Sequence, residues 1–211
     1  MVLGPALGGL LVAAVGEGWC FLANSLSYVA VLAGLLAMRL EARAPVTHGP
    51  AVQGVLEGLR FIREATPVRD LLLLLGLLSL MGMPYTALMP IFADQILHGG
   101  ARAMGVLMGL SGVGALTGAL SLALRHSPKG LGRWIAASAC GFGVALIAFS
   151  LSRSYTLSAV LMLPLGFTLM VELASSNTLI QMMIPDALRG RVMSVYSMMF
   201  MGMAPVGALI G

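Results

Sequence analysis

Residues 155–175, YTLSAVLMLPLGFTLMVELAS, contain a single charged residue, Glu172. A stretch of this length can cross the hydrocarbon core of a bilayer as a helix, which takes roughly 20 apolar residues. Six similar segments accompany it, at about 1–16, 19–38, 71–92, 103–124, 134–151 and 192–211. Strand-like alternation is absent from all of them. We therefore predict an all-α integral membrane protein, multi-pass, with about seven transmembrane helices.

The composition of the whole chain supports this class. Of its 211 residues, 59% are hydrophobic and 9% are charged, and the mean hydropathy is +0.97. Soluble domains carry roughly 25% charged residues. This difference excludes an ordinary soluble globule, a disordered tail and a nucleic-acid-binding protein. The lipid bilayer is the expected partner.

The basic residues predict how the chain is oriented. Ten of the twelve fall in alternate loops, at 39–70, 125–133 and 176–191. The loops on the other side contain only Arg102 and Arg153. Cytoplasmic loops carry the excess of Lys and Arg. We therefore expect the ten basic residues on the cytoplasmic side.

The longest loop, 39–70, contains a helical pattern of its own. Apolar residues recur there at helical spacing, with charged residues between them, at Val52, Val55, Leu56, Leu59 and Ile62. This pattern predicts a short amphipathic helix, lying on the membrane surface or serving as a solvated linker. Pro45 and Pro50 precede it and indicate irregular backbone. We place a boundary between two halves of the protein here.

Glycine is concentrated in the first, fourth and seventh segments, which gives the chain a three-helix period. Pairs of small residues four apart let helices approach closely, and internal repeats are typical of transporters. The expected helix-packing residues are Gly105, Gly109, Gly114, Gly118 and Gly207.

Two enzyme and receptor classes with membrane helices are excluded by their missing chemistry. The sequence Gly109-Leu110-Ser111-Gly112 matches the nucleophile motif of intramembrane serine proteases, but every histidine lies in a predicted loop and none can serve as the base. The single lysine, Lys129, is also in a loop, so it cannot bind retinal inside a helix. We expect no enzyme activity, no cofactor and no metal.

Glu172 is the one carboxylate well inside an apolar segment. An ionisable residue within the membrane is a functional candidate by default. Together with Asn177 and Gln181 it forms our candidate proton or substrate site. The alternative is a structural pairing with Ser175 and Ser176.

Five stretches form recognisable motifs: residues 4–9 (GPALGG), 88–93, 112–118, 177–181 and 185–194. Together they resemble motifs of major facilitator superfamily exporters, in the branch of the enterobactin exporter and the macrolide efflux proteins. Residues 4–9 resemble the antiporter motif of the fifth helix, 88–93 and 112–118 resemble helices seven and eight, and the last two stretches resemble the region before helix eleven. The resemblance covers essentially the whole chain.

The resemblance implies a truncated helical bundle containing helices five to eleven of twelve. Residues 1–38 would end the N-terminal bundle, 39–70 would be the cytoplasmic linker, and 71–211 would form an incomplete C-terminal bundle. Both ends of the chain look cut from a longer protein. The missing helices of that protein would then be partners of this chain.

The resemblance also implies proton-coupled efflux of drugs or siderophores by alternating access in the bacterial inner membrane, with the proton gradient as energy source. Two groups of residues would then have roles. The antiporter-motif helix would use Gly4, Pro5, Gly8 and Gly9. The cytoplasmic gate would use Arg133, Arg189, Gly190 and Arg191.

A different class of function stays open at this point. The chain could be a non-transporting membrane remnant or an assembly partner. The DNA upstream of Met1 distinguishes the two: an in-frame extension encoding four more helices favours the exporter. A small-molecule substrate is expected of the exporter, but no residue identifies it.

Overall fold

The structure is a computed structural model that describes residues 17–38, 51–82, 84–125, 127 and 129–210. The chain divides into two compact units, residues 1–48 and 49–211. In the first unit, α2 (Glu17–Ala37) matches the segment predicted at 19–38. The helix predicted at 1–16 lies outside the described residues.

In the second unit, every secondary-structure element of the described residues is a helix. Its elements are α3 (Ala51–Glu64), α4 (Thr66–Gly82), α5 (Pro84–Ile91), the short π-helix η1 (Phe92–Ile96), α6 (Gly100–Ala123), α7 (Leu131–Leu151), α8 (Tyr155–Met183) and α9 (Asp186–Ile210). The prediction of an all-α fold is confirmed, and so is a helix at the amphipathic stretch of the long loop.

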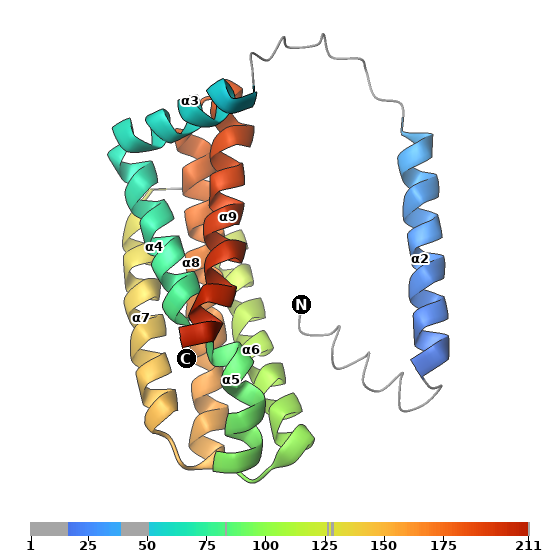
Figure 1. The fold of residues 1–211 in the computed structure, drawn as a ribbon. Coiled ribbons are helices and arrows are strands. Elements are labelled where there is room, and N and C mark those ends of the chain that lie inside the picture. The colour runs from blue at the N-terminus through green and yellow to red at the C-terminus, as the bar shows by residue number, and fades with distance from the viewer. Residues whose placement is uncertain (1–16, 39–50, 83, 126, 128, 211) are drawn as a thin grey trace. The chain divides into compact units, whose positions relative to one another are not determined.

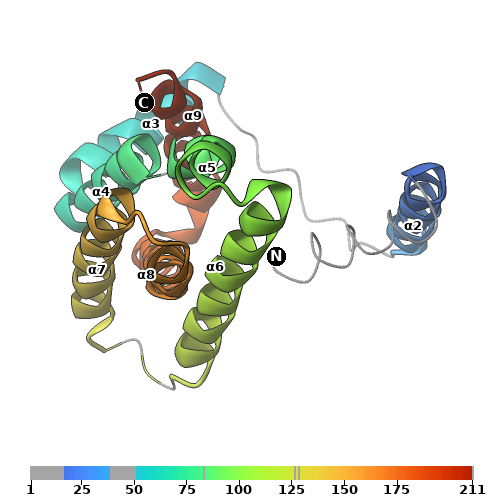
Figure 2. The ribbon, with the colours of Figure 1, turned by 90° about the horizontal axis from the view of Figure 1, so that it is seen from below.

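The long helices of this unit run side by side, and α3 lies across one end of the bundle (Figure 1). Helix α8 packs against α6 on one side and α7 on the other, and α4 packs against α9 (Figure 2). Buried apolar residues hold these helices together. One group of them joins α3, α4, α8 and α9 near the α3 end, and it contains Ile62, Val68, Leu72, Ile180, Ile184 and Val192.

Five helical stretches among the described residues are long and apolar enough to cross a membrane. They are Thr66–Ile96, Arg102–Ala123, Leu131–Leu151, Tyr155–Met183 and Asp186–Leu209. Much of their surface is apolar and exposed; for example, Leu209 is 88% exposed. Large exposed apolar patches are rare on soluble monomers. Lipid is the solvent that suits this surface.

Several predicted boundaries are wrong. The loop predicted at 176–191 is helical except for Ile184 and Pro185, because α8 continues to Met183 and α9 begins at Asp186. The residue before a proline disfavours the helical conformation, and Ile184 is extended, with ψ 129°. Apolar content alone ended the first segment too early and began the second too late, since helices continue beyond the membrane core through polar residues.

The segment predicted as one helix at 71–92 is longer and interrupted. It begins at Thr66, inside the predicted linker, and continues as α4, α5 and η1 to Ile96. Pro84 begins α5, and Pro90 lies inside it. Proline cannot donate a backbone hydrogen bond and favours a kink. In η1 the ladder widens to π spacing, with the Leu97 amide donating to the Phe92 carbonyl oxygen at 3.0 Å.

Helices α6 and α8 are in direct backbone contact. A Cβ atom added at Gly114 would overlap the Leu163 carbonyl oxygen, and one at Gly166 would overlap the Ser111 carbonyl oxygen. At Gly118 it would lie 2.8 Å from the Phe167 carbonyl oxygen. Small residues permit such close approach in membranes, where hydrophobic burial does not drive helix association. The α6–α8 interface therefore depends on glycine at these three positions, because a side chain there would overlap the facing backbone.

We expect Gly114→Ala and Gly166→Ala each to destabilise the protein by about 1–3 kcal/mol, because overpacking forces neighbouring backbones apart. Thermal unfolding of purified protein in detergent measures the effect. Gly143→Ala in α7 is the matched control, since a Cβ there meets no atom within 4 Å. Equal thermal unfolding midpoints for all three variants would contradict the interpretation that α6 and α8 are in close backbone contact.

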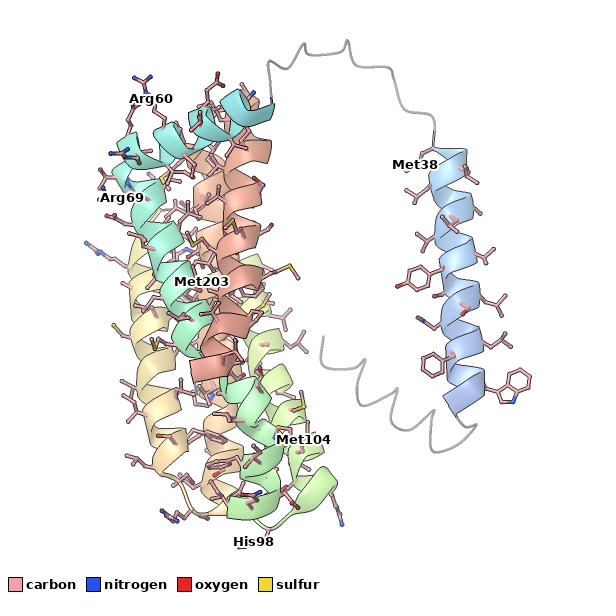
Figure 3. All side chains as sticks on the ribbon, viewed as in Figure 1. Met38, Arg60, Arg69, His98, Met104 and Met203 are labelled. Carbon is pink, nitrogen blue, oxygen red and sulfur yellow. The ribbon has the colours of Figure 1, made fainter. Side chains whose placement is uncertain are left out.

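The two ends of the second unit differ in charge. Arg60 and Arg69 lie at the α3 end, and His98 lies at the opposite end (Figure 3). The α3 end, called the basic end from here on, carries eight described basic residues: Arg60, Arg63, Arg69, Arg125, Lys129, Arg133, Arg189 and Arg191. The other end carries Arg102 and Arg153. By the positive-inside rule, we expect the basic end to face the cytoplasm.

This orientation predicts which cysteines a membrane-impermeant maleimide will reach. In a background with both native cysteines changed to serine, His98→Cys should be labelled in intact spheroplasts. Ser127→Cys should be labelled only after permeabilisation. The native side chains of His98 and Ser127 are both exposed. The reverse labelling pattern would overturn the orientation.

Candidate functional site

Glu172 lies near the middle of α8. The helix runs from Tyr155 to Met183. At 1.5 Å per residue, Glu172 lies within about 5 Å of its midpoint. Because α8 continues to Met183, Glu172 lies well inside the helix, in the half nearer the basic end. A position near the middle of a spanning helix is where transporters place their binding sites.

The Glu172 side chain is fully buried and only half satisfied. Its Oε1 accepts a hydrogen bond from Ser176 Oγ at 2.9 Å. Its Oε2 has no hydrogen-bond partner among the described residues, and neither has the buried Ser175 Oγ. No ion pair of the described residues involves Glu172. Most buried polar atoms are hydrogen-bonded, so an unpaired carboxylate oxygen calls for an explanation.

Asn177 and Gln181 belong to a different face of α8. The sequence placed them beyond the helix, but both lie inside it. Gln181 Nε2 donates to Asn177 Oδ1 at 2.6 Å, and both side chains are half-buried. Since successive residues turn by 100°, Asn177 lies about 140° around the helix from Glu172. The three predicted site residues therefore do not converge on one point.

Tyr196 of α9 lies close to both groups and was not singled out from the sequence. Its hydroxyl donates to the carbonyl oxygen of Leu173, the residue after Glu172, at 3.5 Å, and lies within reach of the Asn177 side chain. The contact joins α8 to α9 across the polar stretch of the bundle. A lone tyrosine in an apolar helix gives no sequence signal, because its hydrogen-bond partner Leu173 lies 23 residues away along the chain.

The predicted gate residues lie at the basic end, in helices and not in loops. Gly190 and Arg191 belong to α9, and Arg133 belongs to the first turn of α7. Arg189 pairs with Asp186, one turn earlier in α9, at 2.8 Å. Arg191 pairs with Glu57 of α3. The loop interpretation of these residues is corrected, while their role stays a prediction.

The Arg191–Glu57 pair is part of a closer contact between α3 and α9. Gly58 faces Arg191, and a Cβ added at Gly58 would lie 3.1 Å from Arg191 Cβ. Ile62, one turn further along, is buried in the core next to Val192. The amphipathic helix therefore docks onto the bundle with one side, while Val55, Leu56 and Leu59 remain exposed. Glu57 had not been identified as the partner because 134 residues separate it from Arg191.

The glycines divide into two groups. Gly114, Gly118 and Gly207 make close backbone contacts; a Cβ at Gly207 would overlap the Leu80 carbonyl oxygen of α4. A Cβ added at Gly105 or Gly109 would meet no atom within 4 Å among the described residues. The predicted antiporter-motif residues Gly4, Pro5, Gly8 and Gly9 lie outside the described residues. Within the described residues, no cluster of His, Cys, Asp and Glu could hold a metal ion.

A profile of the transmembrane secretion effector family, of the major facilitator superfamily, matches residues 2–211. The chain belongs to this family. The resemblance noted from the motifs is thereby confirmed, as is the fold class of a helical bundle of this superfamily. The protein is a multi-pass membrane protein.

Two curated relatives are the enterobactin exporters EntS of Escherichia coli O1:K1 / APEC and of Escherichia coli O139:H28 (strain E24377A / ETEC). Each is 29% identical to this chain over 198 residues, which is 93% of this chain and 47% of the relative. The chain thus spans about half the length of the curated relatives it matches. No solved structure matches the chain.

The contact between Arg191 and Glu57 can be measured by a double-mutant cycle. Arg191→Gln, Glu57→Gln and the double variant should reveal a coupling of about 0.5–1 kcal/mol in thermal unfolding, as expected for a partly exposed ion pair. The Arg60–Glu64 pair, at 2.9 Å and more exposed, is the control and should give a smaller coupling. Additive effects of the two α3–α9 changes would contradict an energetic role for this contact.

Proposed function

We propose that this chain forms part of an exporter that moves a small molecule out across the bacterial inner membrane, driven by protons through alternating access. Three findings support it. The chain belongs to the transmembrane secretion effector family, its relatives above are enterobactin exporters, and α8 carries a buried, half-satisfied carboxyl group. The last observation carries the proposal, because only it concerns a coupling mechanism.

Glu172 is suited to carrying a proton. Burying an unpaired carboxylate charge is unfavourable, so the group is better tolerated as the neutral acid while it is enclosed. Opening of the bundle to water on one side would solvate the carboxylate and let the proton leave. Ser176 keeps the carboxyl group in one orientation through its 2.9 Å hydrogen bond. Alternating exposure of Glu172 would thus couple proton movement to the rocking of the helices.

Asn177, Gln181 and Tyr196 are the polar groups available to a substrate near Glu172. They lie on α8 and α9, on the part of the helices between Glu172 and the basic end. Gly4, Pro5, Gly8 and Gly9 would shape the contact with the other half of the exporter. Arg133 and residues 189–191 would form the cytoplasmic gate, with Arg191 held by Glu57 of α3.

The test is secretion of enterobactin by a host that synthesises it and lacks its own enterobactin exporter. Because the chain spans about half the length of its relatives, the gene is supplied with its full genomic context. Glu172→Gln should lower secretion by about 10²-fold or more, within the range that a positioned proton-transfer group contributes. Glu172→Asp should retain part of the activity.

Two control variants isolate the role of the carboxyl group. Ser176→Ala removes its hydrogen bond but leaves the acid, and should reduce secretion only modestly. Asp94→Asn removes an exposed carboxylate from η1, at the opposite end from the basic residues, and should leave secretion unchanged. Full secretion by the Glu172→Gln variant would contradict a role of Glu172 in proton coupling.

A broader measurement tests export itself. Deletion of the gene from its native host is followed by a drug-susceptibility and siderophore-secretion panel, with and without a protonophore. The proposal is supported if deletion of the gene lowers export of a compound and a protonophore lowers the same export in the undeleted host. An unchanged panel would favour the alternative, a non-transporting remnant or assembly partner.

A further inference from the structure

A cavity of about 500 Å³ opens at the basic end between α6, the residues that follow it, α7 and α8. Its walls are chiefly apolar. They include Ala123 of α6 and a stripe of α8 residues spaced by four, among them Met170, Ala174 and Met182. This stripe extends along about 18 Å of helix. That is close to the hydrocarbon thickness of one leaflet, half of the ~30 Å core.

The mouth of the cavity has the opposite character, because it is cationic. Arg125 and Ser127 line it. The Arg125 guanidinium donates from Nε to the Ser127 carbonyl oxygen at 3.1 Å and from Nη2 to the Lys129 carbonyl oxygen. It also lies over the Trp134 ring, 5.2 Å from the ring centroid. All of these partners are neutral, so they orient the guanidinium and leave its charge uncompensated.

The neighbouring cations are not neutralised either. Lys129 and Arg133 follow in the same stretch, and none of the ion pairs of the described residues includes them or Arg125. Elsewhere at this end, Arg60, Arg69, Arg189 and Arg191 each contact a carboxylate, whereas Arg63 belongs to none of the ion pairs of the described residues. Three of the four unpaired cations described at this end therefore lie within residues 125–133, and Arg125 is the one of them that lines the cavity.

We propose that this cavity binds an anionic phospholipid from the leaflet at the basic end, with its phosphate at Arg125 and an acyl chain against α6 and α8. A free anion would use the cations but not the apolar walls, and a neutral lipid would use the walls but not the cations. Basic pockets between transmembrane helices on the cytoplasmic side are suited to acidic head groups. Trp134 adds the aromatic ring that favours the membrane interface.

The orientation signal of the loops does not by itself account for this arrangement. The positive-inside rule requires basic residues on one side, in any conformation. Here two backbone carbonyl groups and an aromatic ring hold one guanidinium in place beside an apolar cavity. The cavity lining includes neither Glu172 nor Ser176, so lipid binding can be measured separately from the proposed proton coupling.

The first test uses the full-length protein, purified in detergent and titrated with phosphatidylglycerol in native mass spectrometry. The double variant Arg125→Gln/Lys129→Gln should bind about 25-fold more weakly, because each cation near an anionic surface contributes roughly fivefold. Arg60→Gln is the control: it removes an exposed cation from the same end, one already paired with Glu64. Its affinity for phosphatidylglycerol should be unchanged.

The second test addresses the apolar wall and keeps every charge. Ala174→Leu fills the cavity and should weaken phosphatidylglycerol binding, whereas Ala137→Leu, on the exposed face of α7, should not. Circular dichroism and monodispersity establish that each variant is folded. Should Ala174→Leu not fold, the double cation variant decides alone.

The comparison ligands identify the source of the phosphate. Phosphatidylcholine with the same acyl chains should bind the wild type clearly more weakly than phosphatidylglycerol does. Soluble glycerol 3-phosphate should not displace the lipid. Equal binding of the two lipids, displacement by glycerol 3-phosphate, or unchanged binding in the double cation variant would each overturn the proposal.

Discussion

Direct backbone contact between α6 and α8 holds the centre of this bundle together. Lipid tails are as apolar as leucine, so helices in a bilayer gain little from burying apolar side chains against each other. What remains is dispersion at short range, which needs small residues. Gly114 of α6 and Gly166 of α8 permit this short range, because each lies against the backbone of the other helix. The position of α8, and with it the position of Glu172, depends on this contact.

The same helix serves two chemically different surroundings. One face of α8 carries Glu172 and Ser176, enclosed and only partly hydrogen-bonded. Another face, at Met170, Ala174 and Met182, lines the cavity whose mouth is Arg125. A helix can serve both surroundings because residues four apart lie along one side of it. Glu172 and Ala174, two residues apart, therefore lie on different sides. The buried acid and the proposed lipid site can therefore act without sharing a residue.

Much of the fold could be predicted from the sequence. Long apolar segments indicated the spanning helices, and spacing of Val55, Leu59 and Ile62 indicated α3. Ends of helices were predicted poorly, because hydropathy marks where the membrane core ends and not where the backbone hydrogen bonds end. Asn177 and Gln181 were placed outside α8 for that reason. The prolines at 84 and 185 gave the better signal for a boundary.

By itself, the sequence determined the membrane class, the helical content, the orientation signal in the basic residues and the family motifs, because each depends on local composition or spacing. Only the tertiary structure decided which residues meet. It paired Glu57 with Arg191 across 134 residues, brought Tyr196 to α8, and left Oε2 of Glu172 without a partner among the described residues. Such contacts depend on how helices rotate and slide against one another. Helix packing sets that rotation, and apolar segments of similar composition do not encode it in a readable pattern.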